Sequence, residues 1–470
     1  MNFSERKYFP FIVLFIAVFI SRVPFLSAGY GVEEDSWGIA LAGFNTYFTH
    51  IYEPSRFPGH PVHEFIYSAF WGLPPFFYNA SSAFFSAIAV VSFALILKEL
   101  KFKHFFIAAL ALAFTPVFYI SSTYTIDFIW TIAFILISFY ALLKNQFVFC
   151  GIFLGLAIGC RITSGAMLFP FLIIFWEKNA VNENIKNGLK VLLSLIVVIF
   201  ISYLPLINQF GLSFFMYYDQ FPYPSMAKVF YKMIPGVFGF LGVMALGVCI
   251  VLAFIYRKKI VRGELFENGL NKKIIISSFV VIVLFTLSYF RLPQKSGYMI
   301  TIIPFLILLL GYYLNSKLFN FLCSALIVSS FLFSINLTDK LRGASYSRLA
   351  MIFNVSGQEL FLDPISGPIF SDYSKRLQKM KYTDEVIDMT SHVNTKTVVI
   401  AGWWYNEIMV TIISSNNTKN SFVRFESYID SEKMKDYITD GYVIKYLPEQ
   451  NIYNDQMFKM DFTDKVATEF

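Results

Sequence analysis

Three adjacent carboxylates, Glu33, Glu34 and Asp35, stand just after the first long apolar segment of the chain. Ionisable residues this close to a membrane span are costly, and they usually serve an ion path, proton chemistry or substrate binding. A carboxylate here could act as a general base that takes a proton from a hydroxyl group. The simpler alternative is an acidic helix start, because residues 39–48 are expected to be helical; this would account for one or two of the acids.

Two arginines and one more aspartate could complete such a site. Arg56 lies in an irregular, rigid run with proline and glycine, and its planar guanidinium suits phosphate oxygens. Asp127 opens a later apolar segment, where it could orient an acceptor or hold a cation, or simply cap a helix. Arg161 follows a glycine-rich apolar segment and needs an anion, which a substrate phosphate or Asp127 could supply. For Arg56 the alternative is contact with lipid headgroups.

A short loop further along the chain offers Arg291, Lys295 and Tyr298. The two cations could bind a lipid phosphate or a pyrophosphate, with Tyr298 as a possible substrate contact; anchoring to headgroups is equally compatible with the pattern. His60 and Glu64, four residues apart, are candidate acceptor or donor contacts. They could also ligate a metal with His63, but this motif is weak, and local hydrogen bonding at a helix start is the favoured interpretation.

Composition indicates a membrane protein with many spans. Of 470 residues, 56% are hydrophobic and only 15% charged, and the mean hydropathy is +0.59. Soluble domains have about 25% charged residues. The net charge of +7 does not indicate nucleic-acid binding, because the basic residues lie between apolar segments rather than on one face. The four cysteines lie in apolar runs without metal-ligand spacing.

About eleven apolar segments are long enough to be read as transmembrane helices. The first lacks the features of a cleaved signal peptide and is read as a retained span. The expected spans are residues 10–26, 80–97, 104–121, 127–143, 147–162, 164–176, 189–207, 233–256, 274–290, 298–314 and 318–335.

Charge bias orients these segments. The loops on the N-terminal side carry sixteen lysines and arginines, against seven in the other set. Because basic residues in short loops remain in the cytoplasm, the N-terminus is predicted to be cytoplasmic. The acidic run Glu33–Asp35, together with Arg56, Asp127, Arg161 and Lys295, is then on the outer face. We therefore predict a polar cavity that opens outward.

The chain after residue 335 changes character. Charged residues become frequent, residues 373–393 and 430–439 have helical patterns, and residues 398–404, 421–428 and 443–447 have strand patterns. The predicted organisation is a transmembrane catalytic domain over residues 1–335 and a small extracytoplasmic α/β domain over residues 336–470. Residues 208–232, with Tyr217, Tyr218, Asp219 and Tyr223, are expected to lie at the membrane interface.

The order of these residues resembles the GT-C superfamily of membrane glycosyltransferases, in particular the branch of protein O-mannosyltransferases and lipid A aminoarabinose transferases. The similar parts are the acidic run in the first outer loop, the Ser55-Arg56-x-Pro58-Gly59-x-Pro61 segment, Asp127 at the start of the fourth span and Arg161 after a glycine-rich span. The segment from Leu292 to Pro304 is also similar. The fold class expected is a polytopic α-helical membrane protein of GT-C type.

The resemblance implies transfer of a hexosyl or pentosyl group from a polyprenyl-phosphate donor to a lipid, glycan or protein acceptor, in the inner or plasma membrane. Asp35 would be the general base, with Glu33 and Glu34 as alternatives; Arg56, with Arg161, Arg291 or Lys295, would bind the donor phosphate. No cofactor is expected, and a divalent metal is possible but not required, because cations of the protein can neutralise the phosphate.

Two other functions fit a polytopic chain of this kind. An O-antigen polymerase or ligase would use pyrophosphate-linked glycans, but a large central outer loop is expected there, and here the largest outer region is C-terminal. A transporter of lipid-linked sugars would show paired, broken spans and internal repeats, and neither is evident in this sequence.

Overall fold

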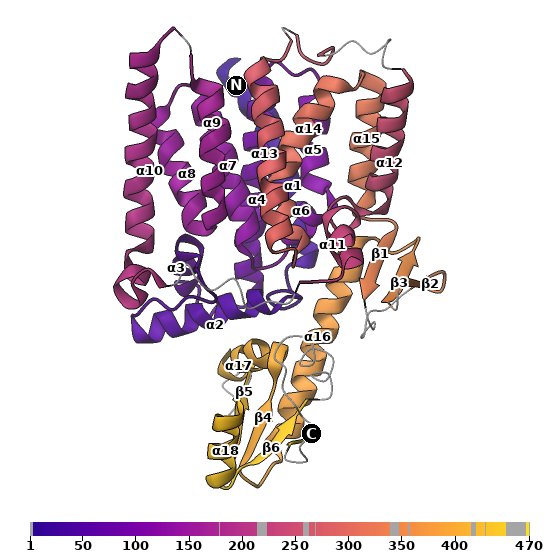
Figure 1. Ribbon diagram of the computed structural model, residues 1–470. Helices are drawn as coiled ribbons and strands as arrows, with labels where there is room; N and C mark the ends of the chain where they lie inside the picture. Colours follow the sequence, from indigo (N-terminus) through magenta and orange to yellow (C-terminus); the bar gives the residue numbers. More distant parts are fainter. Residues whose placement is uncertain are drawn as a thin grey trace.

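The computed structural model describes residues 3–177, 179–213, 223–256, 263–267, 269–338, 347–355, 358–414, 420–427, 429–447 and 467–469. Long helices stand side by side in a bundle, which we call the helix layer, and α2 (Glu34–Thr49) lies across its lower end in Figure 1. The strands and helices between residues 397 and 446 lie beyond α2, away from the end where the N-terminus lies, whereas the strands between residues 334 and 363 lie beside the lower end of the helices.

Apolar helices lie at all eleven predicted spans. Five of them, α1, α4, α10, α12 and α13, are long and apolar enough to cross a membrane. This identifies a multi-pass membrane protein; the number of crossings and their orientation stay predictions. The helices are α1 (Phe3–Arg22), α4 (Pro75–Glu99), α5 (Phe105–Phe114), α6 (Pro116–Ser121), α7 (Asp127–Leu143), α8 (Phe147–Cys160), α9 (Leu168–Phe175), α10 (Val181–Phe210), α12 (Pro235–Ile255), α13 (Lys272–Arg291), α14 (Ile302–Tyr313) and α15 (Ser316–Ser329).

Several of the expected spans are not one continuous helix, and residues 104–121 and 164–176 are two examples. Residues 104–121 form two helices, because Pro116 has no N–H for the helical ladder and holds Thr115 in an extended conformation with ψ 128°. Residues 164–176 begin as a 3₁₀ helix, η2 (Ile162–Met167), before α9. Arg161, which is extended, separates α8 from η2.

Three glycines at four-residue spacing bring α8 against α10. A Cβ atom at Gly151 would lie 2.3 Å from the carbonyl oxygen of Val191, and one at Gly155 would lie 2.7 Å from Cβ of Val198. Gly159 has a similarly close contact, 2.4 Å, with the side chain of Val62. Small residues at this spacing allow helices to pack closely in a membrane. The packing fixes the end of α8, where Arg161 follows.

The first loop after α1 contains short helices. α2 (Glu34–Thr49) begins within the acidic run, and α3 (Pro61–Ser68) has Pro61 at its first position, as expected. Short helices also flank other loops: η1 (Val23–Phe25), α11 (Met226–Met233) and η4 (Ser296–Met299). Of the predicted interfacial stretch 208–232, residues 214–222, which include Tyr217, Tyr218 and Asp219, lie outside the described residues.

The described residues of the C-terminal region form two sheets. The first is antiparallel, with strand order β1-β3-β2, and was not predicted from the sequence. Its first strand takes up the end of the last expected span, so that α15 stops at Ser329 rather than near residue 335. The strands are β1 (Ser334–Thr338), β2 (Met351–Val355) and β3 (Gln358–Asp363).

The second sheet is parallel, with strand order β5-β4-β6-β7. Five of its elements, α16, β4, β5, α18 and β6, agree with the predicted patterns to within a few residues at most boundaries, whereas η5, α17 and β7 were not predicted. The elements are α16 (Pro368–Ser391), β4 (Thr397–Ile400), η5 (Gly402–Trp404), α17 (Tyr405–Ser414), β5 (Val423–Glu426), α18 (Ser431–Thr439), β6 (Val443–Tyr446) and β7 (Ala467–Glu469). The figure places α17 next to α2 (Figure 1), and the two helices are in contact.

Candidate active site

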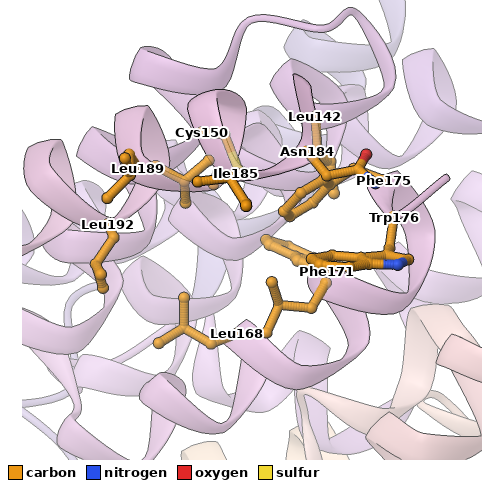
Figure 2. A pocket seen from close by; sticks show the side chains of 13 residues that line it. Leu142, Cys150, Leu168, Phe171, Phe175, Trp176, Asn184, Ile185, Leu189 and Leu192 are labelled. Carbon is orange, nitrogen blue, oxygen red and sulfur yellow. The ribbon is translucent and has the colours of Figure 1, made fainter. Parts of the chain in front are cut away.

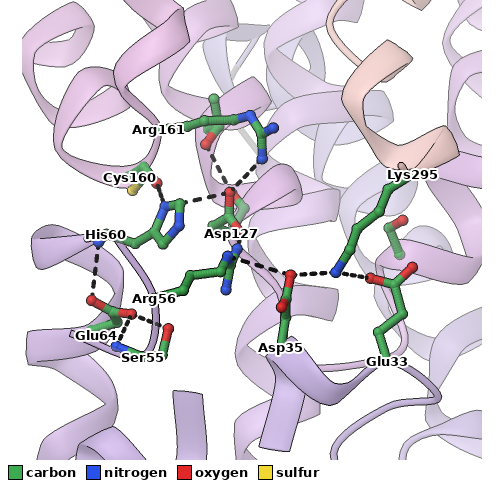
Figure 3. A network of polar contacts seen from close by, with 12 residues as sticks. Glu33, Asp35, Ser55, Arg56, His60, Glu64, Asp127, Cys160, Arg161 and Lys295 are labelled. Carbon is green, nitrogen blue, oxygen red and sulfur yellow. Dashed lines mark hydrogen bonds and ion pairs between the residues drawn. The ribbon is translucent and has the colours of Figure 1, made fainter. Parts of the chain in front are cut away.

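Charged residues from five separate segments meet at the end of the helix layer that carries α2 (Figure 3). The acids belong to helix starts: Glu33 precedes α2, Asp35 lies in its first turn, and Asp127 lies in the first turn of α7. The cations lie in connections between helices. We call this set the polar network; it consists of Glu33, Asp35, Arg56, Asp127, Arg161 and Lys295.

Asp127 is the buried centre of one half of the network. Its side chain has no exposed surface. Nη2 of Arg56 lies 2.6 Å from one carboxylate oxygen, and Nη1 of Arg161 lies 3.1 Å from the other. His60 Nδ1 lies 3.7 Å from the second oxygen, while it donates to the carbonyl of Cys160 at 2.6 Å. Both oxygens are therefore occupied by guanidinium groups, and Asp127 can orient Arg56 and Arg161 rather than accept a proton.

Asp35 is the centre of the other half and is partly open to solvent, with 23% of its side chain exposed. Nε of Arg56 lies 3.3 Å from Oδ2, and Nζ of Lys295 donates to the same oxygen. Burial opposes the charged form of Asp35, but Arg56 and Lys295 outweigh it and lower its pKa to about 2. Asp35 is thus ionised at neutral pH and lies beside two cations.

Glu33 and Glu34 have different surroundings from Asp35. Glu33 is the N-cap residue of α2, but its side chain makes no capping hydrogen bond; it lies 2.6 Å from Nζ of Lys295. Glu34 accepts a long hydrogen bond of 3.4 Å from Asn406 of α17. Burial and the neighbouring charge of Asp35 raise the pKa of Glu34 to about 8. The expected acidic helix start is present, with Glu34 and Asp35 in the first turn of α2, but the carboxylate of Glu33 pairs with Lys295 instead of capping the helix. Glu34 is mostly protonated at neutral pH.

Glu64 holds the loop that carries Arg56. Its carboxylate accepts hydrogen bonds from the backbone N–H groups of Ser55 and His60, each at 3.0 Å. It also accepts from the hydroxyl groups of Tyr52 and Ser55. Glu64 is 2% exposed, so these donors satisfy a buried carboxylate. The geometry assigns Glu64 a structural task, and its contact with the substrate stays a prediction.

Aromatic rings hold Arg161 in place. The centre of its guanidinium lies 4.3 Å from the ring of Tyr298 and 4.8 Å from the ring of Phe128. Tyr298 follows Gly297, where a Cβ atom would lie 2.1 Å from the ring of Phe128. The loop from Lys295 to Tyr298 is therefore packed tightly against the start of α7. Arg291 is the last residue of α13, and its side chain is exposed. From the loop that follows, Lys295 belongs to the polar network.

The polar network balances its charges in the resting state. Three cations, Arg56, Arg161 and Lys295, pair with three carboxylates, Glu33, Asp35 and Asp127. Within the described part of the chain, no group of three or more His, Cys, Asp or Glu side chains could hold a metal ion. The described geometry can supply a base and cations for an anionic leaving group.

A cavity of about 300 Å³ lies at the other end of the helix layer, between α7, α8, α9 and α10 (Figure 2). Its wall is apolar apart from Asn184, which forms hydrogen bonds with the backbone of Glu177. The cavity lies near Cys150 at the start of α8, whereas the polar network lies at the end of the same helix. It suits hydrocarbon chains and contributes nothing to the charged site.

Two residues near the acidic run were not found from the sequence. Lys379 of α16 donates to the carbonyl of Val32 at 3.1 Å, and Asn406 of α17 contacts Glu34. Both belong to the region after residue 335, where polar residues are frequent and no pattern distinguishes them. The contact depends on how the C-terminal region packs on α2, which the sequence does not reveal.

The sequence matches no protein-family model and no curated protein. Solved structures do match: ArnT from Cupriavidus metallidurans bound to undecaprenyl phosphate has a TM-score of 0.56 at 12% identity, over 94% of each chain. This protein has the ArnT fold. The apo structure of the same ArnT gives a TM-score of 0.55 at 11% identity, over 96% of this chain and 95% of that chain.

The likeness to ArnT covers nearly the whole chain, including the C-terminal region. The resemblance to the GT-C superfamily that the sequence predicted is thereby confirmed for the fold. At this low identity the comparison supports the fold alone, so the chemistry rests on the polar network.

Proposed function

We propose that this protein transfers a sugar from a polyprenyl-phosphate donor to an acceptor hydroxyl group, at the outer face of the membrane. The observation that carries the proposal is the position of Asp35, an ionised carboxylate that two cations contact at the end of a layer of membrane helices. The ArnT fold supports the class of donor, because one ArnT structure contains undecaprenyl phosphate.

The reaction needs a base and a place for the leaving phosphate. The acceptor oxygen attacks the anomeric carbon, the bond from that carbon to the phosphate oxygen breaks, and its electrons leave with the phosphate. Asp35 takes the proton of the acceptor hydroxyl group. Arg56 and Lys295 contact Asp35 and would lie beside the phosphate, where negative charge develops.

Binding of the donor changes the partners of Asp35 in this mechanism. Lys295 and Arg56 are shared between carboxylates in the resting state, so a phosphate competes with Asp35 for them. As the cations turn toward the phosphate, the pKa of Asp35 rises from about 2 toward its ordinary value. The carboxylate thus becomes a stronger base when the donor is in place.

The remaining residues have supporting tasks in this proposal. Asp127 orients Arg56 and Arg161, and Arg161 with Tyr298 contributes to the phosphate site. Residues 1–335 form the catalytic part, residues 336–470 lie outside the membrane, and the N-terminus is cytoplasmic. No cofactor takes part. His60, Glu64 and Arg291 act on the substrate only indirectly, through the segments that they hold in place or belong to.

A transfer assay with the purified protein in lipid nanodiscs tests the proposal. The protein is supplied with undecaprenyl-phosphate sugars that carry a labelled hexose or pentose and with a lipid extract as acceptor. We expect release of undecaprenyl phosphate and a labelled product, without added divalent metal. Turnover of undecaprenyl-pyrophosphate glycans instead would support a polymerase or ligase. Movement of a lipid-linked sugar across the bilayer without a glycosyl product would support a transporter.

A further inference from the structure

Two helices of the C-terminal region reach the acidic run directly. α16 leaves the end of the helix layer and runs into the C-terminal region, and α17 lies against α2 (Figure 1). Their polar side chains near Val32 and Glu34 have no part in the transfer mechanism described above. These contacts join residues more than 300 positions apart in the chain, since Lys379 and Val32 are 347 residues apart.

The first half of α16 is fixed to the membrane part by a buried arginine. Nη1 of Arg376 donates to the carbonyl oxygens of Phe25 and Thr123, each at 3.0 Å, and Nη2 donates to the hydroxyl group of Thr123 at 3.1 Å. Nε lies 2.9 Å from the carboxylate of Asp372. Arg376 is 1% exposed. The helix therefore holds one position against the ends of α1 and α6.

Lys379, one turn further along α16, faces the acidic run. Its Nζ donates to the carbonyl oxygen of Val32 at 3.1 Å and lies 2.8 Å from Oε2 of Glu407 in α17. The ammonium group also lies 4.9 Å from the centre of the Trp404 ring. Glu407 is fully buried. A buried carboxylate needs a cation, so Glu407 fixes where Lys379 can be, and Lys379 in turn holds the residue before Glu33.

Asn406 of α17 makes the second contact with the start of α2. Its amide nitrogen lies 3.4 Å from Oε1 of Glu34. Gly38 permits this approach, because a Cβ atom there would lie 3.1 Å from the same nitrogen. The start of α2 is thus held on both sides of Glu33: at Val32 by α16 and at Glu34 by α17.

We propose that Lys379, placed by Glu407, and Asn406 are positioning residues that hold the start of α2 so that Asp35 faces Lys295 and Arg56. This inference rests on the proposed transfer of a sugar by Asp35. The C-terminal region then completes the geometry of the active site without touching the reacting atoms. A displaced Val32 would move Asp35 relative to the donor, and small misplacements of a reacting group lower the rate more than they lower binding.

The test uses the full chain in nanodiscs and a double variant, Lys379→Met with Glu407→Gln, which removes both charges and leaves no unpaired buried carboxylate. We expect kcat to fall about tenfold to 100-fold, the scale for small misplacements, with the KM for the donor within about twofold of wild type, because the donor contacts are unchanged. Lys379→Arg keeps the cation and should restore most of the rate. Lys381→Met, at an exposed position of the same helix, is the matched control.

Hydrogen–deuterium exchange of peptides that cover residues 30–40 gives a readout that is independent of activity. We expect faster exchange there in the double variant and no change in the peptides of α7 and α8. Unchanged exchange, or faster exchange with a wild-type kcat, would overturn the positioning role. A wild-type protein that transfers no sugar would refute the proposed function, and the exchange data would still decide whether α16 and α17 hold the acidic run.

Discussion

Replacement of Asp35 by asparagine separates the role of this carboxylate from the roles of Glu33 and Glu34. The amide keeps the size of the side chain and one oxygen that can accept from Arg56 and Lys295, but it cannot take a proton at neutral pH. Removal of a general base lowers kcat by about 100-fold to 10,000-fold. We expect a loss in this range for Asp35→Asn in the nanodisc transfer assay.

The structure also predicts that this variant folds. In Asp35→Asn, Lys295 keeps Glu33 at 2.6 Å and Arg56 keeps Asp127 at 2.6 Å, so neither cation loses all its partners. The loss of stability should therefore be well below the ~3–5 kcal/mol that follows when a buried charge is left alone. Thermal unfolding of the purified variant measures this, and a folded but inactive protein is the expected result.

Glu34→Gln is the matched control. The pKa of Glu34 is raised to about 8, so its side chain is mostly neutral at pH 7 and glutamine resembles the form that is already present. We expect activity within about threefold of wild type, below the ~1 kcal/mol that a typical hydrogen bond contributes. Glu33→Gln removes one partner of Lys295 but leaves Asp35 in place, so an intermediate loss is expected.

The pH dependence of kcat/KM distinguishes the two acids in the wild-type protein. If Asp35 is the base, its pKa of about 2 keeps it ionised throughout, and kcat/KM is level between about pH 6.5 and pH 9. If Glu34 is the base, its pKa of about 8 makes kcat/KM fall roughly tenfold per pH unit below that value. A tenfold decline of this kind, or near-normal turnover by Asp35→Asn, would refute the assignment of Asp35.

Three further substitutions test the parts around the base. Glu64→Leu leaves several buried donors of the Arg56 loop without an acceptor, at about 1–3 kcal/mol each, so the melting temperature should fall markedly, and less for Glu64→Gln. Arg161→Lys keeps the charge but loses the planar guanidinium that lies over two aromatic rings and pairs with Asp127. We expect kcat/KM to fall by the equivalent of about 1.5–3 kcal/mol. Gly297→Ala places a methyl group against the Phe128 ring, so unfolding free energy should fall by about 1–3 kcal/mol, with weaker donor binding through Lys295.

Much of the membrane part could be predicted from the sequence, because a span leaves a clear apolar signal. The signal also indicates at which end of the helix layer a residue lies. Asp127 and Arg161 were expected on the same side because an even number of spans, α7 and α8, lies between them. The apolar signal does not reveal toward which side of its helix a side chain points. The ion pair between Arg161 and Asp127 depends on how α7 and α8 pack against each other, which the apolar signal does not reveal.

The contacts of the acidic run could not be predicted, because their partners are distant in sequence. Lys295 is 260 residues from Asp35, and Asn406 is 372 residues from Glu34. Local rules suggested helix capping by the acids, and α2 does begin there, yet Glu33 turns its carboxylate to Lys295 instead. The strands β1 to β3 were missed for a related reason: they are short, and no local pattern marks the residues that pair in β1 with β3 and in β2 with β3.

The pairing of charges gives a reason why the proposed base and the proposed phosphate site belong to one network. In the resting state three carboxylates share three cations, and Lys295 and Arg56 both contact Asp35. During the proposed transfer, negative charge grows on the phosphate while Asp35 loses its charge to the proton of the acceptor. The total charge in the site therefore stays constant, and cations that stabilised Asp35 stabilise the phosphate with little movement. Glu34, which is mostly neutral and faces Asn406 instead of Lys295, cannot take part in this exchange. The geometry thus favours Asp35 among the three acids.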